Sequence, residues 1–154
     1  MDNGRYVFKS LAGSLLMGTA SGYLSQTGVA TLLNLTPQRQ LPGFLQWPWA
    51  RRLSLASSGG EMFANAFIST LPSRIDPQAL SGRIAFGAVG AAVLAHSRGR
   101  SVFVPAIVGG TSAAIAAKAA HDVRAALSRH VPDPLVGLAE NAVAVGLAVA
   151  ATRQ

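Results

Sequence analysis

The sequence predicts an all-α fold: a small polytopic membrane helix bundle of about four to five apolar helices, with residues 84–95 as a candidate re-entrant segment. Half of the 154 residues are hydrophobic and only 12% are charged, whereas soluble domains carry about 25% charged residues. The charges fall between the apolar stretches, rather than along the outer face of amphipathic helices. Because this length corresponds to one domain, we expect residues 1–154 to form a single membrane-embedded helical domain.

The first apolar segment covers residues 7–35 and is expected to bend near residues 25–28. A basic start before an apolar stretch is also typical of a secretory signal. Here glycine and serine interrupt the apolar middle, and no convincing Ala-x-Ala cleavage site precedes a polar mature start. We therefore interpret it as a retained membrane segment.

A polar, proline-bearing loop over residues 36–52 follows. Its Trp47 and Trp49 are bracketed by prolines and followed by two arginines. Tryptophans in such a place are typical of anchors at the membrane interface. An ordinary aromatic cluster within the loop explains them equally well, so both interpretations stand.

Four further apolar segments follow, at residues 53–71, 84–95, 102–120 and 135–151. Crossing the hydrocarbon core takes about 20 residues. The segment at 84–95 is too short to cross without tilt or help from its flanks, so a re-entrant or buried helix is the alternative. The segment that begins at residue 102 continues as an amphipathic extension to residue 129.

The positive-inside rule gives no orientation if all five segments cross. One side would hold Arg5, Lys9, Arg74, Arg83, Arg124 and Arg129, and the other Arg39, Arg51, Arg52, Arg98, Arg100 and Arg153. Equal numbers of basic residues favour neither side.

The composition argues against several functions. The net charge of +7 comes from arginines that occur singly or in pairs, without a basic helix face or stacking aromatics, so nucleic-acid binding is not expected. Arginines beside apolar spans fit the anionic headgroups of a lipid bilayer better. Cysteine is absent and the three histidines lack ligand spacing, so neither a metal nor a cofactor is expected. No catalytic motif occurs, and we expect neither an enzyme nor an identifiable small-molecule substrate.

Two glutamates lie inside otherwise apolar segments and form the candidate polar site. Glu61 has Asn65 one helical turn later on the same face, and Glu140 is followed by Asn141. A carboxyl group at the bilayer centre costs about 2.5–3.5 kcal/mol on insertion scales. The two glutamates bind helices together by hydrogen bonds, lie at the membrane interface near a segment end, or face each other as an ion or proton site. The sequence leaves these alternatives open.

A second polar pair, Lys118 and Asp122, ends the fourth segment. The acid follows the base by four residues, which is the less favourable order on a helix. We interpret it as a partly buried structural pair.

Small residues recur at helical spacing and predict close helix packing. Ser14, Gly18 and Gly22 form one such row, and Gly110 lies in another between two alanines. In lipid, such rows let helix backbones approach closely. They serve either packing within one chain or a homo-oligomer.

Four motifs in order resemble a small bacterial integral-membrane family known as domain of unknown function 4126. They are GTASGYLSQTGVATLL at 18–33, EMFANAFISTLPSR at 61–74, LSGRIAFGAVGA at 80–91 and PDPLVGLAENAVAVGLA at 132–148. The resemblance covers most of the chain. It implies a multi-helix protein of the bacterial inner (cytoplasmic) membrane and brings no activity with it.

The chain departs from that family at charged positions. Leu24 stands where the family typically has arginine, Asn65 and Ala66 stand where it has Asp–Lys, and Asn141 stands where it has aspartate. Both glutamates are retained. We therefore expect a structural or accessory membrane protein, with a small oligomeric transporter or channel for protons or cations as the alternative.

Overall fold

The protein is described by a computed structural model that covers residues 3–68 and 73–154, except for the side chains of residues 3–7, 9 and 10. The described residues form an all-helical bundle without strands, which confirms the fold class. Its helices are α1 (Asn3–Tyr23), α2 (Thr27–Leu35), α3 (Pro48–Phe67), α4 (Pro77–Ser97), α5 (Phe103–Leu127) and α6 (Asp133–Arg153), with 3₁₀ turns η1 (Gln38–Gln40) and η2 (Gly43–Leu45). Among the described residues α4, α5 and α6 are long and apolar enough to cross a membrane, so the expected number of about four to five is not confirmed.

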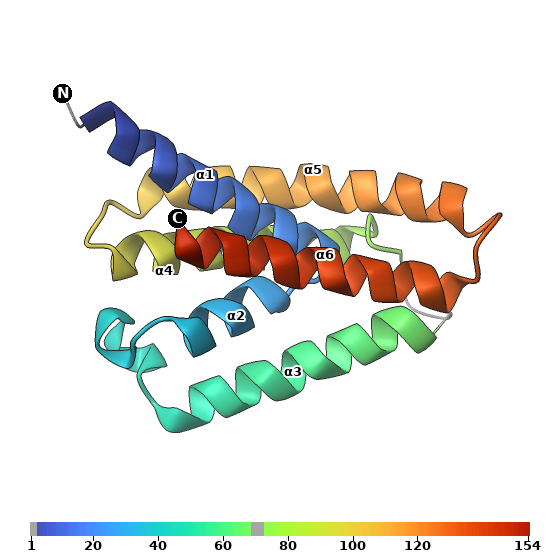
Figure 1. The fold of residues 1–154 in the computed structure, drawn as a ribbon, viewed down its shortest axis with the longest axis horizontal. Coiled ribbons are helices and arrows are strands. Elements are labelled where there is room, and N and C mark those ends of the chain that lie inside the picture. The colour runs from blue at the N-terminus through green and yellow to red at the C-terminus, as the bar shows by residue number, and fades with distance from the viewer. Residues whose placement is uncertain (1–2, 69–72) are drawn as a thin grey trace.

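Helices α3 to α6 run alternately up and down the long axis of the bundle (Figure 1). Both chain termini, the loop between α2 and α3, and the α4–α5 turn lie toward one end, which we call the termini end. Helix α3 ends and α4 begins at the opposite end, where the α5–α6 turn also lies. Every charged residue of the bundle can therefore be assigned to one end or the other.

Residues 7–35 do not form one crossing segment. The helix breaks at residues 24–26, close to the expected bend, and α2 runs back toward the termini end (Figure 1). The two helices touch closely, because a Cβ at Gly28 would lie only 2.9 Å from Met17 Sδ and Ser21 Oγ. The α1–α2 hairpin thus turns back within the bundle.

The expectation of a short third segment at residues 84–95 was wrong. Those residues are the middle of α4, a 21-residue helix that begins at Pro77, where a proline suits the first helical position. Its first two turns contain polar side chains, including Arg83, so the sequence predicted a loop for these residues. Helix α4 ends at Ser97, and Gly99 just after it has a φ of 65°. The backbone N–H groups of Gly99 and Arg100 donate to carbonyl oxygens in the last turn of α4, as in a Schellman cap.

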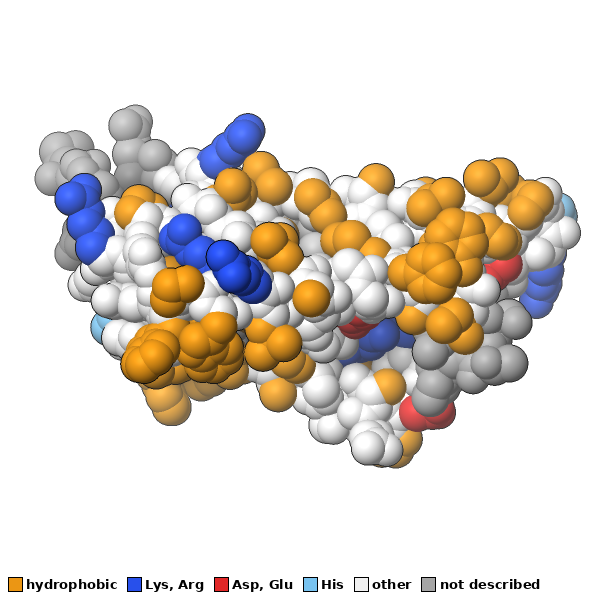
Figure 2. Space-filling model, turned by 90° about the horizontal axis from the view of Figure 1, so that it is seen from below, with side chains coloured by type: hydrophobic (Ala, Val, Ile, Leu, Met, Phe, Trp, Pro, Cys, Tyr) orange, Lys and Arg blue, Asp and Glu red, His pale blue; other side chains and the backbone are white. Residues whose placement is uncertain are grey.

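Helix α3 has the inverse of a soluble amphipathic pattern. It begins at Pro48, five residues before the expected start at residue 53, and ends at Phe67; residues 69–72 lie outside the described residues. Its large apolar side chains point outward and are exposed: Leu53, Leu55, Phe63 and Phe67. Its polar side chains point into the bundle: Ser57, Ser58, Glu61 and Asn65. Figure 2 shows hydrophobic side chains spread over the face of the molecule on which α3 lies. This arrangement fits a lipid environment.

Tight packing in the bundle depends on glycine where helices cross. A Cβ at Gly18 of α1 would overlap Ser112 Oγ and the Gly109 backbone of α5. At Gly22 it would lie 2.6 Å from the Ala113 carbonyl oxygen. The row that includes Ser14, itself buried, is therefore used in contact within this chain. Van der Waals contact of this kind is what holds helices together in lipid.

Candidate functional site

The buried and partly buried carboxylates of the described residues lie in two clusters, in the half of the bundle away from the termini end. The hairpin cluster consists of Ser25, Gln26, Ser57, Glu61 and Arg83. The Glu140 cluster consists of Asn65, Arg74, Arg124, Asp133, Glu140 and Asn141. By the rise of a helix, Glu61 and Glu140 lie about 10 Å from the nearer ends of α3 and α6.

In the hairpin cluster, the Glu61 carboxylate binds the N-terminal end of α2. The backbone N–H of Ser25 donates to Glu61 Oε1 at 2.6 Å, and the N–H of Gln26 donates to Oε2 at 2.9 Å. Both amides belong to the turn that starts α2, whose first amides have no partner within the helix. Glu61 thus supplies from α3 the cap that the residues of the turn do not supply themselves.

Arg83 of α4 binds the other half of the same break. Its Nη1 donates to the carbonyl oxygen of Tyr23 at 3.0 Å and lies 3.5 Å from that of Gly22, the last carbonyls of α1. The same atom lies 3.9 Å from Glu61 Oε1. A cation therefore sits at the negative end of the α1 dipole and an anion at the positive end of the α2 dipole. The two charges compensate both helix ends and each other.

In the Glu140 cluster, one carboxylate oxygen receives two guanidinium groups. Glu140 Oε2 accepts hydrogen bonds from Arg74 Nη2 and from Arg124 Nη1, the latter at 2.8 Å. Glu140 and Arg74 are both about 8% exposed. Arg124 also forms a two-point ion pair with Asp133, at 2.9 and 2.6 Å. Two arginines thus face two carboxylates, and the cluster carries no net charge.

The asparagines connect this charge network to α3. Asn65 Oδ1 accepts from Arg74 at 2.8 Å and from Arg124 at 3.0 Å, while its Nδ2 donates to Asn141 Oδ1 at 2.9 Å. Asn141 in turn donates to the Met62 carbonyl oxygen at 2.9 Å. Two polar atoms of the cluster, Arg74 Nη1 and Glu140 Oε1, are buried without a hydrogen-bond partner among the described residues.

The structure brings three of the four candidate site residues together and separates the fourth. Asn65, Glu140 and Asn141 share one cluster, whereas Glu61 bonds to the α1–α2 turn and not to Asn65 one helical turn away. Among the described residues no hydrogen bond or ion pair joins Glu61 to Glu140. The shared-proton geometry considered for the two glutamates is therefore not present.

Sequence reasoning missed the arginines, which it placed in loops beside lipid headgroups. Four of them instead donate across the bundle to carbonyls at the C-terminal end of a different helix. Arg83 binds the end of α1, Arg51 that of α2, Arg124 that of α3, and Arg98 that of α6. Burial, and then the nearby Arg100, lower the pKa of Arg98, whose Nη2 donates to the carbonyl oxygens of Ala151 and Thr152. Cations at helix C-termini are stabilising.

One of the secondary predictions needs correction. Lys118 and Asp122 do pair at 3.0 Å, but their side chains are 67% and 57% exposed, so the pair is not partly buried. Gly110 is buried, and a Cβ there would meet Ile84 and Ala88 of α4 at 3.4–3.5 Å. The neighbouring Gly109 crosses α4 more closely, because a Cβ there would overlap the Gly87 backbone and Ala91. Spacing alone did not distinguish the two glycines.

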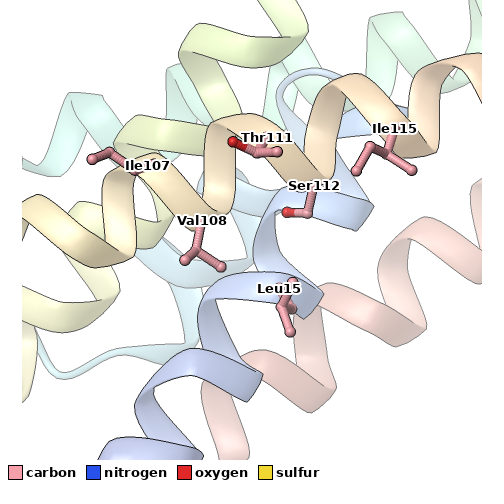
Figure 3. Close-up of a pocket in the computed structure, with 6 residues that line it drawn as sticks. All are labelled: Leu15, Ile107, Val108, Thr111, Ser112 and Ile115. Carbon is pink, nitrogen blue, oxygen red and sulfur yellow. The ribbon is translucent and has the colours of Figure 1, made fainter.

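A separate groove of about 240 Å³ lies between α1 and α5 (Figure 3). It is lined by Leu15, Ile107, Val108, Thr111, Ser112 and Ile115, none of which is charged. The hydroxyl of Ser112 is engaged, donating to the Gly109 carbonyl oxygen at 3.1 Å. The groove suits an apolar chain and includes neither glutamate. In the described part of the chain, no group of His, Asp and Glu side chains has the arrangement of a metal site.

No family model, curated protein or solved structure matches this chain. The resemblance to domain of unknown function 4126 therefore stays a prediction from its motifs. In the described residues, the chain is an all-helical bundle with three helices long and apolar enough to cross a membrane. Arginine–carboxylate clusters lie inside this bundle.

Proposed function

We propose that this chain is a structural or accessory membrane protein, a helical scaffold with no reaction of its own. The observation that carries the proposal is that Glu61 and Glu140 already bind arginines and backbone or amide donors of the same chain. Family resemblance adds the bacterial inner membrane as its location.

A carboxylate that conducts protons or cations has to exchange its partner during each cycle. Removing a guanidinium from a buried carboxylate leaves two uncompensated charges, at a cost of about 3–5 kcal/mol. Glu140 would have to release two arginines, and Glu61 would have to release the amides that begin α2. These costs favour a static role for both side chains.

The test is ion flux through purified protein in liposomes under imposed proton and potassium gradients. Wild type is compared with the Glu61→Gln/Glu140→Gln double variant, with protein-free liposomes as the baseline and an ionophore as the positive control. We expect wild type to match the baseline, and the double variant to differ only in stability or assembly. Wild-type flux that disappears in a correctly assembled double variant would refute the scaffold.

A transporter or channel is the second candidate, and the α1–α2 hairpin is the observation that favours it. Discontinuous helices whose ends meet inside a bundle build the substrate sites of many transporters. Here those ends bind Glu61 and Arg83, and Glu140 Oε1 remains without a partner among the described residues. The flux experiment separates this candidate from the scaffold.

A homo-oligomer remains a proposal as well. Gly18 and Gly22 pack against α5 and Ser14 is buried, so this row is not free for a second copy. Any oligomer would have to use other surfaces, such as the exposed apolar face of α3. Cross-linking in native membranes, followed by mass determination, tests this point.

A further inference from the structure

The α1–α2 hairpin changes how the basic residues are distributed between the two ends of the bundle. Because α2 returns to the side where α1 begins, the start of α1 lies at the same end as the loop before α3. Eight of the 13 Lys and Arg residues therefore lie at the termini end: Arg5, Lys9, Arg39, Arg51, Arg52, Arg98, Arg100 and Arg153. For five crossing segments, twelve of the 13 basic residues divided six against six. The same twelve now divide eight against four, and Lys118 makes it eight against five.

The acidic residues have the opposite distribution. Among the described residues all five carboxylates lie in the other half, at Glu61, Asp76, Asp122, Asp133 and Glu140. There they accompany five basic residues, of which Arg74, Arg83 and Arg124 form ion pairs inside the bundle. On the face shown in Figure 2, most Lys and Arg side chains gather toward the left, the termini end, and the red side chains lie away from it. Among the described residues, the excess of positive charge thus lies at the termini end.

Three of the arginines at the termini end are exposed, namely Arg39, Arg52 and Arg153. Arg51 and Arg98 at the same end bind helix carbonyls instead. The same end of the bundle holds large aromatic side chains that are at least half exposed: Phe44, Trp47, Trp49 and Phe103. Amphipathic aromatics at headgroup level, with basic residues next to them, are typical of a membrane interface.

We propose that the termini end is a docking surface for the anionic phospholipid headgroups of the cytoplasmic leaflet, which places both chain termini in the cytoplasm. Short basic loops remain on the cytoplasmic side, and acidic residues contribute little to that choice. Anionic headgroups attract exposed basic side chains near the surface. Arg39, Arg52 and Arg153 are the contacts, with Trp47 and Trp49 at the depth of the headgroups. The inference holds for a scaffold and for an ion path alike.

Cysteine labelling tests the orientation directly, since the chain has no cysteine of its own. Ser101→Cys marks the α4–α5 turn at the termini end, and His130→Cys marks the α5–α6 turn at the opposite end; both positions are exposed. Each variant is expressed in the bacterial inner membrane, and spheroplasts are treated with a membrane-impermeant maleimide. We expect His130→Cys to react at once and Ser101→Cys to react only after permeabilisation. The reverse pattern, or equal labelling of both, would overturn the proposal.

Lipid retention tests the headgroup contacts. Full-length protein is released from nanodiscs made of equal parts phosphatidylglycerol and phosphatidylcholine, and the lipids that stay bound are identified by native mass spectrometry. Wild type should retain phosphatidylglycerol preferentially. The triple variant Arg39→Gln/Arg52→Gln/Arg153→Gln should lose that retention by on the order of 10-fold or more.

The control for that experiment is Lys118→Gln/Arg129→Gln, which removes two exposed charges at the opposite end and should leave retention unchanged. A wild type without preference for phosphatidylglycerol, or a triple variant that keeps it, would show that another partner or none binds there. If the triple variant does not fold, the labelling result decides, because it involves no arginine.

Discussion

Replacing Glu140 by glutamine removes the charge that Arg74 and Arg124 share, while the side chain keeps nearly the same size. After the change, Arg124 still has its two-point pair with Asp133. Arg74 is buried and keeps only neutral acceptors, the side-chain oxygen of Asn65 and the new amide oxygen at position 140. The main consequence is therefore one uncompensated guanidinium inside the bundle.

The expected magnitude follows from how well each carboxylate is shielded from solvent. Loss of one partner of a buried pair costs about 3–5 kcal/mol, and the Glu140 and Arg74 side chains are each 8% exposed. An exposed pair contributes about 0–1 kcal/mol, and Asp122 is 57% exposed. Globular chains of this length lose about 2–4 °C in Tm per kcal/mol. We therefore expect Glu140→Gln to lower Tm by roughly 6–20 °C and Asp122→Asn to have little effect.

The assay is thermal unfolding of the purified protein in lipid nanodiscs, followed by the fluorescence of Trp47 and Trp49 at a fixed scan rate. Asp122→Asn is the matched control, because it also removes one carboxylate from an ion pair, the exposed pair with Lys118. The double variant Arg74→Gln/Glu140→Gln should recover part of the loss, since it removes the orphaned charge as well. Equal Tm values for Glu140→Gln and Asp122→Asn, or no recovery in the double variant, would refute the reasoning.

Two further predictions address the hairpin and the helix crossings. Glu61→Gln weakens the cap of α2, and caps stabilise other helices by about 0.5–2 kcal/mol. The amides of Ser25 and Gln26 should therefore exchange hydrogen faster, while amides in the middle of α5 keep their exchange rates. Unchanged exchange at Ser25 and Gln26 would mean that the carboxylate does not act as a cap. Gly18→Ala should lower Tm because the added Cβ overlaps α5. Gly59→Ala should leave Tm unchanged or raise it, because a Cβ there meets nothing within 4 Å and alanine favours a helix by about 1 kcal/mol. Similar losses of Tm for the two variants would contradict the close crossing at Gly18.

Prediction from sequence succeeded where single residues or neighbours along the chain decide the outcome. The apolar stretch that begins at residue 102 appears as α5, and residues 135–151 lie within α6. The break near residues 25–28 was also expected, because serine and glycine weaken a helix locally. It failed for the first turns of α4, since Arg83 looks like a loop residue until its partners are known.

The candidate site was predicted in part for the same reason. Glu61, Asn65 and Glu140 stood out because a polar side chain in an apolar segment is rare. Their partners did not, because Arg74, Arg83 and Arg124 are separated from those glutamates by between 16 and 66 residues. The residues next to an arginine in the sequence do not indicate which distant carboxylate it contacts in the folded chain.

By itself, the sequence determined that the chain is an apolar helical protein with a few polar groups inside it, since composition and hydropathy add up residue by residue. Only the tertiary structure decided that α2 turns back beside α1, that each buried carboxylate has arginine partners, and that the excess positive charge lies at one end. These features depend on which helices meet when the bundle closes, and helix ends and buried charges far apart in the chain then compensate one another.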